Sequence, residues 1–230
     1  MPIKILILGE GANDVGIYDF NGQWISGSII NLLTKINDKV ELSFIPINKK
    51  HLPNTLPMKD RPSLEGHGKV IQKMFFYSYI RKMEYDIMVY YGDTDKEAGT
   101  KTTKTQAKKA SQVAYKQAYD AFDKFDVKGI AIIPLRMLES WLLADEQAFL
   151  NAFDIKVSLP KNPEMLWGDK RDPKSNHPKK TLERILSRFG LNSDTSNFCT
   201  IYDNASIPIL ESKCPISFPP FLMKAQEYLT

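Results

Sequence analysis

Four short apolar runs, each followed by a helical pattern, constrain the fold of this chain more than any other feature. The runs are rich in Ile, Val and Tyr, and they cover residues 3–8, 40–47, 87–91 and 129–134. Runs of this length and composition are typical of strands buried in a parallel sheet. Their alternation with helices predicts βαβ units and an α/β fold with a parallel or mostly parallel sheet. Right-handed crossovers should then place helices on both faces of the sheet.

The helical patterns and the prolines predict how the chain is divided. Helices are expected over residues 23–37, 69–83, 101–124 and 138–149, where apolar residues recur with helical spacing. After Phe153 the pattern changes, because prolines separate short helical patterns such as 181–189 and 221–229. We therefore expect an α/β domain over residues 1–153 and a helical C-terminal extension over residues 154–230, packed on the domain.

Composition and charge exclude few classes of function. Hydrophobic residues make up 43% and charged residues 25% of the 230 residues, which are ordinary values for a globular protein. The net charge of +4 is a mild bias that neither demands nor excludes nucleic acid. No apolar run is long enough for a signal peptide or a membrane span. With two cysteines, Cys199 and Cys214, this composition favours a reducing cytoplasm and no membrane association.

Acidic residues follow the first and third predicted strands. Glu10 lies between Gly9 and Gly11, and Asp93 and Asp95 stand in the sequence Gly-Asp-Thr-Asp. Ligands of open α/β sheets bind beyond the carboxyl ends of the strands, so these three carboxylates form a candidate site for Mg²⁺ or Mn²⁺. A simpler interpretation also fits, because Gly-Asp-Thr-Asp is good turn sequence and Asp caps helices.

Further charged residues follow the third and fourth strands. Glu139 lies beyond the fourth strand and could face the same site, although an acid at a helix start needs no other explanation. Arg136 could contact a phosphate oxygen or pair with an acid. Lys96 and Lys104 belong to a lysine-rich stretch that would suit a polyanionic substrate, whereas a solvated helix face is the commoner reason for such a pattern.

Together these residues resemble the Toprim domain of topoisomerases, primases, ribonucleases that mature ribosomal RNA, and OLD-type nucleases. The resemblance consists of a strand-ending glutamate in Gly-Glu-Gly, a later strand ending in Asp-x-Asp, and a sheet of βα units. The stretch Glu-Ser-Trp-Leu-Leu-Ala-Asp at 139–145 and the segment His-Pro-Lys-Lys-Thr-Leu at 177–182 are similar to a family of small Toprim-like proteins. The resemblance extends from residue 3 to about residue 186.

The resemblance implies a Mg²⁺-dependent nuclease that cleaves phosphodiester bonds of DNA or RNA. In the Toprim pattern the glutamate assists proton transfer at the scissile phosphate and the aspartates hold Mg²⁺. These roles correspond here to Glu10 and to Asp93 and Asp95, with Glu139 as an auxiliary acid. Small Toprim-like nucleases also serve as effectors of bacterial anti-phage defence beside an ATPase, which implies a partner protein of that kind.

Two other functions are consistent with the same residues. The fold could bind a nucleotide or a partner without catalysing a reaction. An Asp-x-Asp motif after an apolar strand also occurs in haloacid-dehalogenase-type phosphatases and metal-dependent glycosyltransferases. The phosphatases require Thr or Val two residues after the second Asp, where this chain has Glu97, and they carry the motif on their first strand.

Overall fold

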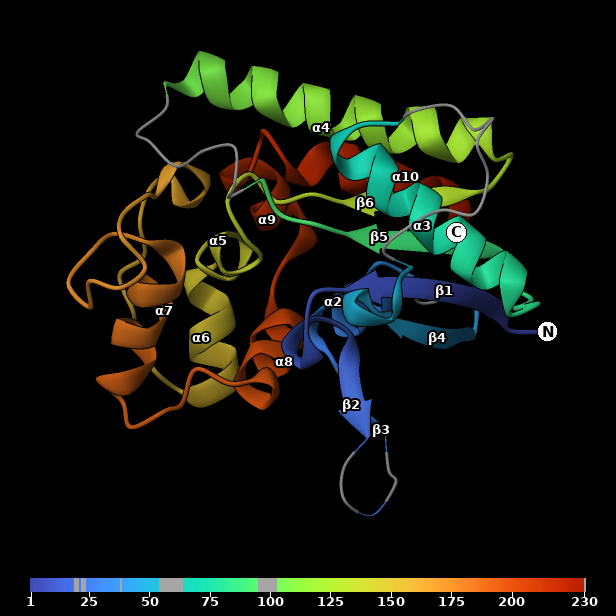
Figure 1. Cartoon of the computed structure of the whole chain (residues 1–230). Coiled ribbons are helices and arrows are strands. Elements are labelled where there is room, and N and C mark those ends of the chain that lie inside the picture. Colours follow the sequence, from blue (N-terminus) through green and yellow to red (C-terminus); the bar gives the residue numbers. More distant parts are fainter. Residues whose placement is uncertain (19–20, 22–23, 38, 54–63, 95–102, 230) are drawn as a thin grey trace.

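The core of the protein is a sheet of four parallel strands. The computed structural model describes residues 1–18, 21, 24–37, 39–53, 64–94 and 103–229. The strands lie in the order β4-β1-β5-β6 (Figure 1), and their bounds are β1 (Ile3–Gly9), β4 (Leu42–Asn48), β5 (Ile87–Tyr91) and β6 (Gly129–Ile132). The predicted parallel sheet is confirmed, and each strand lies within two residues of its expected bounds.

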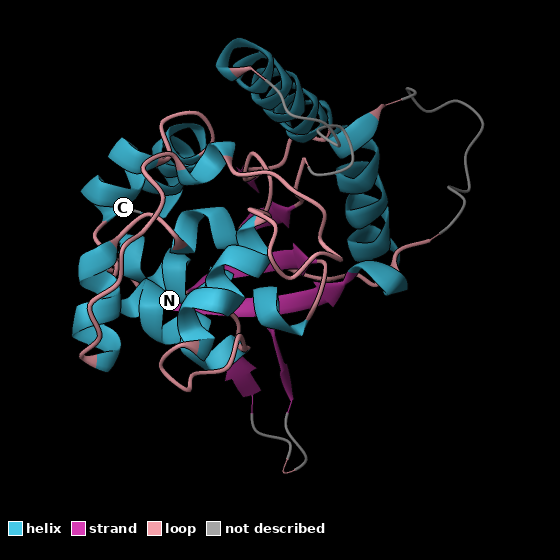
Figure 2. Cartoon of the chain, turned by 90° about the vertical axis from the view of Figure 1, so that its left-hand side faces the viewer, coloured by secondary structure: helices cyan, strands magenta, loops and turns pink. Residues whose placement is uncertain are grey.

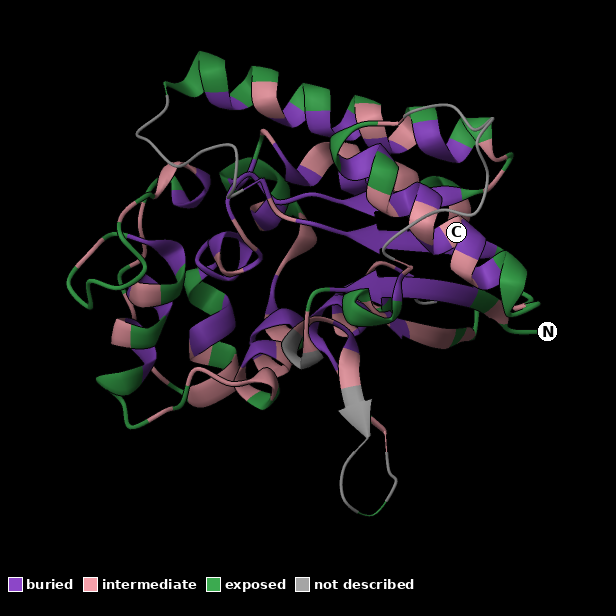
Figure 3. Ribbon diagram, in the orientation of Figure 1, coloured by how far each residue is buried: buried purple, intermediate pink, exposed green. Residues whose placement is uncertain are grey.

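The three crossover helices cover both faces of this sheet. They are α2 (Ser28–Ile36) between β1 and β4, α3 (Gly66–Ile80) between β4 and β5, and α4 (Lys104–Lys124) between β5 and β6. The first crossover runs in one direction along the sheet and the other two run in the opposite direction. Right-handed crossovers therefore place α2 on one face and α3 and α4, which pack against each other, on the other. Figure 2 shows helices on both sides of the strands, and β5 and β6 are buried along their whole length (Figure 3).

The helix predicted over residues 23–37 is wrong in its first turn. The chain instead forms the short helix α1 (Ala12–Val15) and an antiparallel hairpin of β2 (Gly16–Tyr18) and β3 (Trp24–Ser26), which projects from the domain in Figure 1. Helix α2 starts only at Ser28, after Gly27. The extended backbone of Gly27 lies directly against the backbone of Asp14, where a side chain would overlap it, so the helix cannot begin earlier.

The helix predicted over residues 138–149 is divided into two. Helix α5 (Glu139–Leu142) ends before Asp145, and α6 (Glu146–Phe153) begins after it. The Asp145 carboxylate caps α6 by accepting a hydrogen bond from the backbone N–H of Gln147 at 2.9 Å, and its other oxygen accepts one from Ser206 at 2.8 Å. A contact with the distant C-terminal region therefore stabilises the break.

The C-terminal region shares the hydrophobic core of the sheet. Its elements are the 3-10 turn η2 (Pro163–Met165) and the helices α7 (Pro178–Ser187), α8 (Thr195–Asn204), α9 (Ile207–Lys213) and α10 (Phe218–Leu229). Helix α10 packs against β6 and α2, and α8 packs against α2 and α6. Trp141 of α5 is fully buried against Phe218 and Phe221, with ring centroids 4.9 and 5.5 Å from its own.

A buried carboxylate anchors the start of α10. Glu164 accepts hydrogen bonds from the backbone N–H of Ile216 at 3.0 Å and of Ser217 at 2.8 Å, and from the Ser217 hydroxyl. The Ser217 oxygen also accepts from Trp141 Nε1 at 2.9 Å, and Tyr115 donates to the Ser217 carbonyl at 2.7 Å. This network joins α4, α5, η2 and α10.

Strand β4 is the edge strand next to β1 and contains Pro46. The ladder between them begins with a 2.9 Å hydrogen bond from the Ile3 N–H to the Glu41 carbonyl, and it pairs Ile3 with Leu42.

Cys199 and Cys214 are free thiols. In the described part of the chain, every helix is too short or too polar to cross a membrane.

Candidate functional site

A cavity of about 420 Å³ lies beyond the carboxyl ends of β1 and β5. These two neighbouring strands are the point where the direction of the crossovers reverses, which is where open α/β sheets bind their ligands. The charged side chains that line the cavity are Glu10, Asp14, Asp93, Glu139 and Lys179, and apolar lining comes from Met137, Leu138, Leu142 and Phe198. The structure thus brings together three of the acids predicted from the sequence and adds one acid and one lysine.

Helix α1 returns Asp14 to the end of β1. Its carboxylate Oδ2 accepts hydrogen bonds from the backbone N–H of Glu10 at 3.0 Å and of Gly11 at 2.8 Å. These bonds fix the turn that carries Glu10 out of the strand. Gly27 also lies against the backbone of Asp14, so Asp14 contacts two separate segments of the chain.

Burial and charge make Asp14 unusual among the acids. The pKa of Asp14 is raised to about 7, mainly by burial; the negative charges of Glu139 and Glu10 also raise it, and the hydrogen bonds from the N–H groups of Gly11 and Glu10 lower it. Tyr91 is affected by the same negative charges. Its pKa is well above the ordinary value, mainly because the side chain is buried, and then because of the charges of Asp14, Glu139, Asp93 and Glu10. The negative charges of all four carboxylates therefore affect the same buried side chain.

Asp93 is held by contacts on both sides of it in the chain. The buried hydroxyl of Thr94 donates a hydrogen bond to the Leu135 carbonyl, which joins the loop after β5 to the loop after β6. Before it, Gly92 lies against the hydroxyl of Tyr90, which is 2.8 Å from His67 Nδ1. His67 lies in α3 and is only 8% exposed.

Two lysines from other elements of the chain lie near the acids that follow β1 and β5. Lys49, in the 3-10 turn η1 (Lys49–His51) after β4, forms an ion pair with Glu10. Lys179, in the first turn of α7, lines the cavity itself. Helix α7 packs against α5, whose first residue is Glu139.

The other predicted site residues lie elsewhere or outside the described residues. Asp95 and Lys96 fall in the latter group. Arg136 is 4% exposed, and the described lining of the cavity does not include it. Lys104 is the exposed first residue of α4, and its positive charge lowers the pKa of Glu164, which burial raises. The phosphate-binding roles of Lys96, Lys104 and Arg136 stay predictions.

The chemistry of the cavity fits a divalent cation. Carboxylate oxygens are the ligands that Mg²⁺ and Mn²⁺ prefer, and a cation would offset the burial and, to a smaller extent, the charges of Glu139 and Glu10 that raise the pKa of Asp14. Among the described residues, however, no three His, Cys, Asp or Glu side chains are arranged closely enough to hold a metal ion.

Three residues of this region were not predicted from the sequence. Asp14 stands four residues after Glu10, and an Asp at that distance from a strand end could have suggested a return to the backbone N–H groups. Lys49 follows the second strand at the same edge as Glu10, so its place was available from the predicted topology. Lys179 lies in the segment 177–182 that carries part of the Toprim-like resemblance, but its place at the cavity was not predictable because the position of α7 depends on contacts between distant segments.

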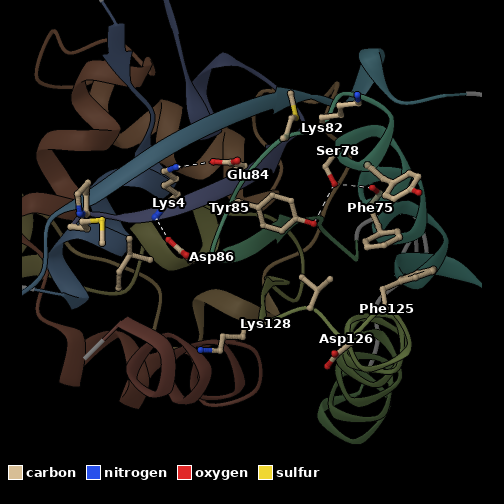
Figure 4. Close-up of a pocket in the computed structure, with 16 residues that line it drawn as sticks. Lys4, Phe75, Ser78, Lys82, Glu84, Tyr85, Asp86, Phe125, Asp126 and Lys128 are labelled. Atoms are coloured by element: carbon tan, nitrogen blue, oxygen red, sulfur yellow. Dashed lines mark hydrogen bonds and ion pairs between the residues drawn. The ribbon is translucent and has the colours of Figure 1, made fainter.

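A larger cavity, of about 1120 Å³, lies at the opposite edge of the sheet (Figure 4). It is lined by the residues that precede β5 and β6 and by the end of α3. Three of its charged residues contact one another: Lys4 pairs with Glu84, and the Asp86 carboxylate accepts from the Lys4 N–H at 2.8 Å. Size therefore does not identify the functional site here, since the acids converge at the other edge.

Comparison of the chain with protein-family models, curated proteins and solved structures finds no match.

Proposed function

We propose that this protein is a Toprim-like, Mg²⁺-dependent nuclease that hydrolyses phosphodiester bonds of DNA or RNA at the cavity formed by Glu10, Asp14, Asp93 and Glu139. The observation that carries the proposal is the placement of these acids. Glu10 and Asp93 end adjacent parallel strands at the point where the crossovers reverse direction, and Glu139 faces the same cavity.

The residues that would hold the cation are Glu10, Asp93 and Asp95. When bound, Mg²⁺ or Mn²⁺ would polarise the phosphate and make the attacking water more acidic. Glu10 would assist the transfer of the water proton, and Glu139 would be an auxiliary acid in the same cavity. Asp14 would fix the backbone of Glu10 through its two N–H hydrogen bonds. The mild positive charge of the chain is compatible with a nucleic-acid substrate.

The resemblance to Toprim-like proteins supports two further parts of the proposal. The protein would act in the cytoplasm as an effector of anti-phage defence, and an ATPase would be its partner. Activity assays should therefore include the purified protein alone and together with any ATPase encoded beside it.

Substitution of Asp93 tests the proposal directly. Asp93→Asn keeps the size of the side chain and removes the charge that a hard cation requires. It should abolish Mn²⁺-dependent hydrolysis of single-stranded DNA and RNA oligonucleotides while the thermal unfolding temperature stays close to that of the wild type. Asp123→Asn, at an exposed position near the far end of α4, is the matched control and should keep full activity. Hydrolysis that survives in Asp93→Asn would place the chemistry elsewhere.

A further inference from the structure

We propose that Lys179, supplied by the C-terminal extension, binds a non-bridging phosphate oxygen of the nucleic acid, so that the substrate site is shared between the sheet and the extension. This inference rests on the proposed function and names a residue that recognises the substrate. Lys179 belongs to a part of the chain that lies far in sequence from the predicted acids.

The first turn of α7 fixes the position of Lys179. The N-terminal residue of the helix is Pro178, which is buried together with His177 before it, and the His177 carbonyl accepts a 2.8 Å hydrogen bond from the Thr181 N–H. The buried face of α7, with Leu182 and Leu186, anchors the helix in the core. The Lys179 backbone is therefore held firmly, whereas its side chain reaches the cavity from an exposed position.

The helix packing also relates Lys179 to the acids. Helix α7 packs against α5, and α5 begins with Glu139, so the lysine and this acid belong to two helices in contact. Lys179 is the one basic side chain among the described residues that line the cavity. An anion that is held at the acids through a cation would therefore meet a positive charge on the side of the extension.

Lys179 differs from two other lysines of this region, which form ion pairs. Lys180 pairs with Glu183 at 2.7 Å within α7, and Lys49 pairs with Glu10. Within the described part of the chain Lys179 has no ion-pair partner, although acids line the same cavity. A lysine at this place binds phosphate as a point charge and contributes to affinity in a salt-dependent way.

The test compares Lys179→Met with Lys180→Met, which removes the adjacent lysine that is already paired. The probe is a fluorescently labelled single-stranded DNA decamer with Ca²⁺ present, and its affinity is measured by anisotropy over a series of salt concentrations. Lys179→Met should weaken binding about tenfold and reduce the slope of log affinity against log salt by roughly 0.7, the single-strand value for one phosphate contact. Lys180→Met should stay within about twofold of the wild type, and Lys179→Arg should restore most of the affinity.

Equal affinity and equal salt slopes for Lys179→Met and Lys180→Met would overturn the inference, and so would a wild-type protein that does not bind the decamer. Hydrolysis with Mn²⁺ separates this inference from the proposed function. Binding that depends on Lys179 without any Asp93-dependent hydrolysis would remove the nuclease function and leave the phosphate contact in place. Asp93-dependent hydrolysis that is unchanged in Lys179→Met, together with unchanged binding, would remove the contact alone.

Discussion

Lys49 forms an ion pair with Glu10, and the two residues follow the neighbouring parallel strands β4 and β1 at the same edge of the sheet. Both side chains are about two-fifths exposed, at 42% and 38%. The ammonium group therefore neutralises the carboxylate to which we assign a role in cation binding. A divalent cation that uses Glu10 has to compete with this lysine.

Lys49→Met should consequently raise the affinity for Mn²⁺. An exposed ion pair is worth up to about 1 kcal/mol, so the gain should be about threefold to fivefold, with little change in the free energy of unfolding. Isothermal titration calorimetry with Mn²⁺ measures it, and Lys50→Met, the adjacent exposed lysine, is the control. Unchanged or weaker Mn²⁺ binding by Lys49→Met would show that Glu10 does not bind the cation.

The pKa of Asp14 predicts how stability depends on pH. Because burial raises this pKa from 3.8 to about 7, the folded protein binds the proton more tightly than the unfolded chain does. This group's stabilising contribution is complete below about pH 4 and is lost as the pH rises through about 7. Asp14→Asn should therefore be more stable than the wild type at pH 8, by about 1 to 3 kcal/mol.

Urea unfolding at several pH values checks this prediction. The advantage of Asp14→Asn over the wild type should shrink steadily as the pH falls from 8 toward 4. Asp120→Asn, at an exposed position of α4, should show no such trend beyond the loss of its ion pair with Lys116. Parallel pH profiles for Asp14→Asn and the wild type would contradict the assignment.

Gly92 should tolerate no side chain, because the Tyr90 hydroxyl and the adjoining ring carbon Cζ occupy the space where a Cβ would lie. An added Cβ at position 92 would overlap that hydroxyl and approach His67 Nδ1 to 3.2 Å. We expect Gly92→Ala to lower the free energy of unfolding by about 1 to 3 kcal/mol. Tyr90→Phe alone should cost about 1 kcal/mol through the lost hydrogen bond to His67.

The double variant Tyr90→Phe/Gly92→Ala should be more stable than the sum of the two single effects predicts, because removal of the hydroxyl relieves the closest overlap and leaves the overlap with the ring carbon Cζ, 2.7 Å from the added Cβ. Chemical unfolding of all four proteins provides the cycle. Strictly additive effects would show that the two positions do not compete for the same space.

Glu164→Ala should destabilise the protein strongly. It leaves the N–H groups of Ile216 and Ser217 without the carboxylate that accepts from them, at a cost of about 3 kcal/mol. Glu164→Gln keeps one acceptor oxygen and should cost less. The measurement is the urea midpoint, followed by Trp fluorescence because Trp141 donates to Ser217. A loss below about 1 kcal/mol in Glu164→Ala would mean that water replaces the carboxylate.

The sheet and its crossovers were predictable because each strand is a short local run and parallel pairing follows from the alternation. The start of α2 was not, since the contact between Gly27 and Asp14 depends on how the chain turns after β1. The burial of His67 was equally hidden, because its partner Tyr90 lies on a strand rather than on the same helix.

For the candidate site, the sequence predicted the strand-ending acids and Glu139 but not Asp14, Lys49 or Lys179. Glu10 and Asp93 followed from the rule that ligands bind at the carboxyl ends of parallel strands. The raised pKa of Asp14 depends on burial and on Glu139, which is 125 positions away in the printed sequence. Lys179 reaches the cavity only because α7 packs against α5.

Pro46 limits the pairing of the edge strand β4 with a strand of another chain. Since the Ile3 N–H donates to the Glu41 carbonyl, the parallel register turns the N–H groups of Ser43, Ile45 and Ile47 toward β1 and leaves position 46 facing outward. The proline thus removes a donor from the side of β4 that faces away from β1, which is an edge of the sheet among the described residues and where a strand of another chain would otherwise add. Concentrated solutions of the protein should resist edge-to-edge aggregation for this reason, and Pro46→Val should lower its solubility.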